Sequence, residues 1–261
     1  MKKFVLNNEK VEGIVYKTQN IIIQKIQNGK KRRCYIIGNG HSLDVDNNDV
    51  IIKHDPGMHE FKPKVNKDTT VYAFYFTFKC SGLEESGKEI AKFVNDLSEE
   101  YEQIFWIGHS KCGLCLYNAS YYCKREIVLV TISTPFSGTI IADKIAVENV
   151  LNSPILKKVY NMIFSDHAVD RDIIPNSNFI MNIKRANYKE HINITSYLNN
   201  IFSCKDIMDL FLFIWDKIMK INGDGLVPID SQQIIYTTRT INLICSHANS
   251  LRKGLDVIEK M

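Results

Sequence analysis

The chain has 261 residues, of which 45% are hydrophobic and 24% are charged. This composition is typical of a globular protein and excludes a collagenous, low-complexity or wholly disordered chain. Lys and Arg number 33 against 29 Asp and Glu, which leaves a net charge of +4. A balance this even does not indicate a phosphate-binding surface, so we expect no nucleic-acid partner.

The sequence also bears on compartment and membrane association. Its seven cysteines are scattered, and its N-terminus lacks the run of about 7–15 apolar residues that a secretion signal needs. We therefore expect free thiols and a cytoplasmic protein. The longest apolar stretch, 207–221, is interrupted by Asp209, Asp216, Lys217 and Lys220. It is therefore not expected to form an integral membrane span.

Short β-branched and aromatic runs alternate with helical patterns along the chain, which predicts an α/β fold with a mostly parallel sheet flanked by helices. A single domain over 1–261 is expected. Helices are predicted over 82–101, directly after Ser110, and over 249–260. The segment 139–223 breaks the alternation and is predicted to be a helical lid or cap insertion. Strands are predicted at 13–18, 20–27, 34–37, 50–53, 71–78, 103–108, 126–132, 193–198 and 240–245.

One motif places a serine where a nucleophile is expected. The apolar run Ile104 to Ile107 leads into Gly108-His109-Ser110-Lys111-Cys112-Gly113, the pattern of a strand, a sharp turn and a helix start. A serine on such a turn projects from the edge of the sheet, and the next amide faces a developing oxyanion. The pattern departs from Gly-X-Ser-X-Gly, because Cys112 stands at the second glycine position.

An activated serine needs a base, and the base needs an orienting carboxylate, in the chain order Ser, Asp or Glu, His. Asp224 lies in the glycine-flanked turn 222–228, and His247 follows the apolar strand 241–245. The order and the strand-end context favour Ser110, Asp224 and His247 as a triad. Asp206, also after a strand, is the rival acid.

At these motifs the sequence resembles the α/β-hydrolase superfamily, in its lipase and esterase branch. Ile36-Ile37-Gly38-Asn39-Gly40 looks like that branch's oxyanion loop after the third strand. The stretches 133–139, 173–179 and 222–228 are similar to its loop after the sixth strand, its insertion and its acid loop. The resemblance implies a serine hydrolase of carboxylic esters, small or lipidic, with nucleophile Ser110, acid Asp224, base His247 and oxyanion amides from Asn39 and Lys111.

Other interpretations stay open. The same triad could cleave a thioester or an amide, and the departure at Cys112 leaves room for a binding protein without catalysis. Cys112 and Cys115 form a Cys-X-X-Cys pattern that could be a redox dithiol. The Lys111 ammonium could recognise acidic substrates or reach solvent along its methylene stem. The histidines show no metal-ligand spacing, so no metal and no cofactor are expected.

Overall fold

The computed structural model describes residues 9–10, 13–29, 33–46, 49–52, 65–77, 79–98, 101–151, 168–184 and 188–261. Within these ranges only the backbone is described at 9–10, 39–46, 49–52, 148–150, 168 and 207–208.

The described strands form one sheet in which β10-β9-β8-β7-β4-β6-β3-β2 are neighbours in that order. From β10 to β6 all pairs are parallel, and β3 and β2 add antiparallel strands at one end. The short strands β1 and β5 pair with each other, and β5 also pairs with β4. The bounds are β1 Glu9–Lys10, β2 Ile14–Lys17, β3 Ile21–Gln27, β4 Arg33–Asp46, β5 Asp49–Ile52, β6 Thr70–Thr77, β7 Gln103–His109, β8 Val128–Ile132, β9 Glu190–Tyr197 and β10 Arg239–Ile244.

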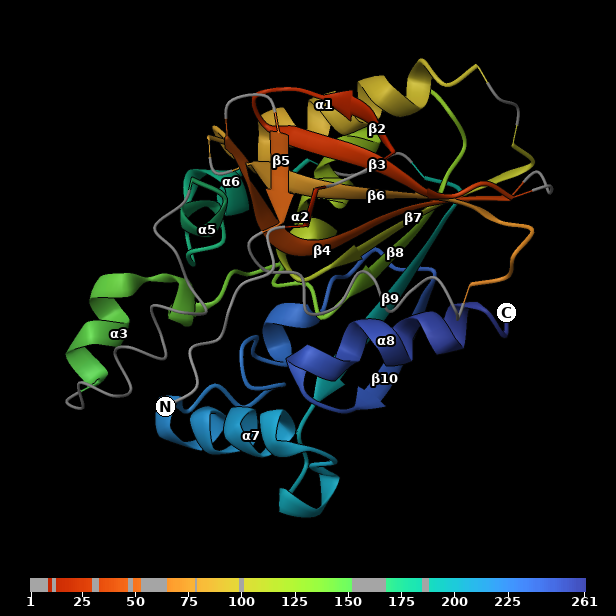
Figure 1. Ribbon diagram of the computed structural model, residues 1–261. Helices are drawn as coiled ribbons and strands as arrows, with labels where there is room; N and C mark the ends of the chain where they lie inside the picture. Colours follow the sequence, from red (N-terminus) through yellow and green to blue (C-terminus); the bar gives the residue numbers. More distant parts are fainter. Residues whose placement is uncertain are drawn as a thin grey trace.

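Both faces of this sheet are covered, as its apolar strands require. Alternate side chains of a strand point to opposite faces, so Phe74 packs with α1 (Leu83–Asn95) and α2 (Lys111–Ala119), whereas Tyr75 packs on the face of α8 (His247–Ile258). Figure 1 shows α1 and α8 on opposite sides of the sheet.

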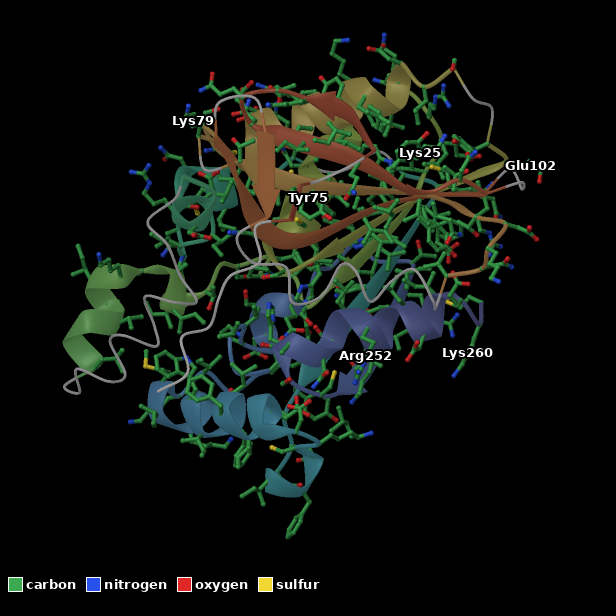
Figure 2. The ribbon with its side chains drawn as sticks, viewed as in Figure 1. Lys25, Tyr75, Lys79, Glu102, Arg252 and Lys260 are labelled. Carbon is green, nitrogen blue, oxygen red and sulfur yellow. The ribbon has the colours of Figure 1, made fainter. Side chains whose placement is uncertain are left out.

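Helix α8 is amphipathic. Leu251, Leu255 and Ile258 are buried against the sheet, whereas Arg252 is exposed, as is Lys260 just after the helix. Figure 2 labels both, Arg252 on α8 and Lys260 near the C-terminal end. The spacing of the apolar residues matches the 3.6-residue turn of a helix, which explains why this segment was predictable. The remaining helices are α3 Lys144–Val150, α5 Ala168–Asp172, α6 Asn178–Met181 and α7 Ile207–Met219.

The predicted α/β class and mostly parallel sheet are confirmed, and each predicted strand is present. Two expectations need correction. Strand β4 does not end at Ile37 but continues to Asp46, with an irregular register against β6 between Gly38 and Ser42. His247 is the first residue of α8 rather than part of a loop.

The predicted insertion 139–223 contains β9, a strand of the sheet that the sequence also predicts, at 193–198. Strand β9 pairs in parallel with β8 on one side and with β10 on the other. Two separate segments therefore flank β9, one containing α3, α5 and α6 and the other containing α7. A lid function for either segment stays a prediction.

Candidate active site

Ser110 occupies a strained turn between β7 and α2. Its φ of 55° and ψ of −132° are rare for a residue with a side chain. Glycines on either side allow the strand and the helix to approach: a Cβ on Gly108 would lie 2.6 Å from the Gly113 backbone, and one on Gly113 would collide with the Thr134 hydroxyl. The backbone geometry is that of a nucleophile elbow.

The departure at Cys112 has a packing explanation. The Cys112 side chain is fully buried and faces Gly38 of β4, where an added Cβ would lie 2.8 Å from its sulfur. Close approach at the elbow is thus provided by Gly108 and Gly113, and the thiol fills the space beside Gly38. Cys115 is also fully buried, and burial raises the pKa of its thiol well above the usual value. Two buried thiols that form no disulfide with each other do not resemble a reactive redox pair.

Asp224 is fully buried, and its carboxylate accepts four hydrogen bonds. One oxygen, Oδ1, accepts from the amides of Leu226 at 3.0 Å and Val227 at 2.8 Å. The other, Oδ2, accepts from Ser196 Oγ and from His247 Nδ1, both at 2.8 Å. Burial opposes ionisation of this carboxyl, but the charge of His247 and these hydrogen bonds outweigh it and hold the pKa below its usual value.

His247 is fixed at the start of α8 by the acid loop. Its amide donates to the Asp224 carbonyl at 2.9 Å, and its Nδ1 donates to the Asp224 carboxylate, which leaves Nε2 as the basic nitrogen. The imidazole lies 4.5 Å, centroid to centroid, from the ring of His109, the residue before Ser110. No hydrogen bond within the described part of the chain joins Ser110 to His247. Such contacts often form only when substrate is bound.

Three further residues support the predicted acid, and the sequence assigned none of them this role. The hydroxyl of Ser196, at the end of β9, bonds Asp224 and in turn accepts from Ser133, a buried residue with a positive φ of 49°. Gln232 is fully buried, accepts from the Ser196 amide at 2.7 Å and donates to the Val227 carbonyl at 3.1 Å. Ser133 lies in the stretch 133–139 noted above, but its contact with Ser196, like those of Gln232, depends on the pairing of distant segments.

The predicted oxyanion donors lie in different backbone settings. Lys111 is the first residue of α2, so its amide has no acceptor within the helix and can face a ligand. Asn39 lies in β4, at the point where pairing with β6 becomes irregular, and not in the loop expected after Ile37. Its contribution to an oxyanion hole stays a prediction.

The Lys111 side chain is held by an ion pair. Its ammonium lies 2.6 Å from Asp170 Oδ1 in α5, and the two side chains are 12% and 8% exposed. It also lies 5.9 Å from the centroid of the Phe76 ring. The expectation that this side chain extends into solvent is therefore wrong. Its charge is compensated within the protein.

The rival acid Asp206 has another role. It is the N-cap of α7, where its carboxylate accepts from the Asp209 amide at 2.8 Å, and it also accepts from the Asn249 side chain. The hydrogen bond to His247 Nδ1 is made by Asp224 instead. In the described ranges, no cluster of His, Cys, Asp or Glu side chains is arranged to hold a metal ion. No described helix is long and apolar enough to cross a bilayer.

Comparison with known proteins identifies the fold but not the individual activity. No family model matches the sequence, and no curated protein matches it. The mature form of a Bacillus licheniformis lipase is 12% identical with a TM-score of 0.55, over 93% of this chain and 97% of the other. A metagenomic carboxyl esterase is 11% identical with a TM-score of 0.53, over 95% and 78%. A Pyrococcus furiosus esterase is 12% identical with a TM-score of 0.50, over 98% and 90%. The sheet order, the elbow and these similarities together show that the chain has the α/β-hydrolase fold.

Proposed function

We propose that this protein is a serine hydrolase that cleaves carboxylic esters through an acyl-enzyme formed on Ser110. The observation that carries the proposal is the buried Asp224–His247 hydrogen bond, which lies at the same end of the sheet as the elbow serine. A buried, ionised carboxylate aimed at Nδ1 is what a catalytic histidine requires to keep its basic Nε2 available.

The chemistry follows from these positions. His247 Nε2 removes the proton from Ser110 Oγ as the oxygen attacks the ester carbonyl. The Lys111 amide, with Asn39 as the second proposed donor, stabilises the oxyanion that develops. Collapse of the tetrahedral intermediate expels the alcohol, which takes its proton from His247. Water then attacks the acyl-enzyme, with His247 again acting as the base, and releases the carboxylic acid.

A fluorophosphonate probe tests for the activated serine. We expect stoichiometric labelling of the wild type and none of Ser110→Ala, whereas Ser137→Ala, which removes an exposed hydroxyl on the loop after β8, should label normally. Ester turnover should fall by about 10⁴-fold or more in Ser110→Ala and His247→Ala, and somewhat less in Asp224→Asn. Asp206→Asn should stay near wild type, because asparagine also caps helices. An unlabelled wild type would indicate a binding protein without catalysis.

A thioesterase is the second candidate. A type II thioesterase from the yersiniabactin biosynthetic pathway has a TM-score of 0.50 over 91% of this chain and 95% of the other, at 8% identity. Acyl-enzyme chemistry is common to esters and thioesters. Comparing kcat/KM for acyl esters and acyl thioesters of matched chain length decides between them. A preference for thioesters at every length would replace the ester assignment.

A further inference from the structure

Two aspartates are buried in α7, a helix that is apolar apart from these residues and Lys217. Asp209 and Asp216 are each 1% exposed, and seven residues separate them. Seven residues are about two helical turns, so both side chains leave the same side of the helix. An ionised carboxylate is costly to bury unless it is paired or hydrogen-bonded. The hydrogen bonds that these two carboxylates accept therefore identify the segments that this side of α7 contacts.

Asp209 is bonded to the residue that precedes the proposed base. Its Oδ1 accepts from the hydroxyl of Ser246 and from Asn249 Nδ2, the latter at 2.8 Å. Its Oδ2 accepts from the Lys205 amide at 3.0 Å. Ser246 is the N-cap of α8, directly before His247. Asp209 thus holds the helix start from which the imidazole projects.

Asp216 is bonded to the residue that precedes the proposed acid. Its Oδ1 accepts from the Gly223 amide at 2.8 Å, and its Oδ2 lies 3.2 Å from the Lys217 ammonium. The Gly223 carbonyl accepts from the Leu198 amide at the end of β9. The start of the acid loop is thus fixed between the sheet and α7.

From this arrangement we propose that Asp209 and Asp216 are positioning residues, through which α7 sets the distance and orientation between Asp224 and His247. One rigid helix contacts the segment before the acid and the segment before the base, and it does so through side chains rather than through the sheet. The proposal rests on the function proposed above. It also means that α7 stays docked during turnover, so that a moving lid, if the chain has one, lies elsewhere.

The test compares Asp209→Ala and Asp216→Ala with Asp143→Ala. Asp143 is the N-cap of α3 and its side chain accepts from the amides of Ile145 and Ala146, so its removal also weakens a helix, but neither of these bonds reaches the segments before Asp224 and His247. We expect kcat for a small soluble ester to fall about 10- to 100-fold in the two α7 variants, with KM changed less than threefold, because small errors in orientation are costly in catalysis. Asp143→Ala should keep kcat within threefold of wild type.

A second readout separates positioning from stability. The proton between His247 Nδ1 and Asp224 should give a downfield NMR signal, assigned by its loss in His247→Ala. We expect this signal to shift or broaden in Asp209→Ala and Asp216→Ala and to be unchanged in Asp143→Ala. Variants that melt at lower temperature but keep both kcat and the proton signal would overturn the proposal.

Two arms guard against ambiguous results. If an aspartate variant does not fold, Ser246→Ala is used instead, because it deletes only the hydroxyl that bonds Asp209. A kcat equal to that of the wild type, together with an unchanged proton signal, would then overturn the proposed role of Asp209. An unlabelled wild type would refute the proposed function, yet the proton signal does not depend on turnover and would still decide whether α7 positions the Asp224–His247 pair.

Discussion

The ion pair between Lys111 and Asp170 lies beside the nucleophile without taking part in the proposed chemistry. It links α2, which begins at the residue after Ser110, to α5, which lies in the segment between β8 and β9. A neighbouring residue strengthens this attachment, because Asp172 of α5 accepts from the Leu83 amide at the start of α1 at 2.6 Å. Lys111 thus fixes α5 close to the elbow.

Removal of the lysine should be costly for stability. In Lys111→Met the Asp170 carboxylate stays mostly buried but loses its cation, which typically destabilises a protein by about 3 kcal/mol. Asp170→Asn in the same chain removes the buried negative charge and should recover more than half of the loss. Urea unfolding of the wild type, both single variants and the double variant measures this coupling. A Lys111→Met variant within about 0.5 kcal/mol of wild type would show that the pair behaves as an exposed one.

At the scale of elements, the contact between β7 and α2 depends on two glycines, Gly108 and Gly113. Gly113→Ala places a methyl group against the Thr134 side chain and 3.0 Å from the Gly108 carbonyl. Overpacking of this kind usually costs about 1–3 kcal/mol, and relief by movement of α2 would also displace Ser110. We expect a lower melting temperature and lower kcat. Gly87→Ala in α1 is the matched control, since its new methyl would lie 3.2 Å from the Ala119 methyl group and alanine favours a helix. Equal losses in the two variants would contradict this account.

Elements whose residue pattern is clear within their own segment could be predicted from sequence. Strands such as β7 and β8 are continuous apolar runs, and α8 has apolar residues at helical spacing, so their positions follow from period and composition. The bounds of β4 could not be predicted, because Gly38-Asn39-Gly40 reads as a turn and only pairing with β6 and β5 extends the strand. Strand β9 is predicted at 193–198, but its start at Glu190 and its place between β8 and β10 follow only from pairing in the sheet.

The same distinction applies to the candidate site. Ser110, Asp224 and His247 lie in motifs whose residue types and order carry a chemical meaning, and the structure brings the acid and the base together. Ser196 and Gln232 support Asp224 only because the fold brings distant segments of the chain together, so their role could not be predicted from sequence. Asp209 and Asp216 looked like interruptions of an apolar stretch, although in the structure they attach α7 to the acid and base loops.

At the scale of the whole molecule, a buried histidine predicts that the fold loses stability in acid. His191 of β9 is fully buried, and its Nε2 lies 2.8 Å from Thr131 Oγ1. Desolvation lowers its pKa to about 4, well below the value of about 6.5 for an exposed histidine. Between these two pH values the unfolded chain binds a proton that the folded chain does not, so stability falls as the pH falls through this window. Asp224 adds to the loss only at lower pH, because its pKa is held below that of a free aspartate.

We therefore expect the free energy of unfolding to decrease by roughly 3 kcal/mol between pH 7 and pH 4, a shift of two to three pKa units at about 1.4 kcal/mol each. Urea unfolding at pH 7 and at pH 4 measures it for the wild type and for His191→Gln. The variant loses packing at both pH values, so the quantity to compare is the difference between them. This difference should shrink in His191→Gln, because glutamine has no proton to bind in the unfolded chain. A difference as large as that of the wild type would assign the acid sensitivity to other groups.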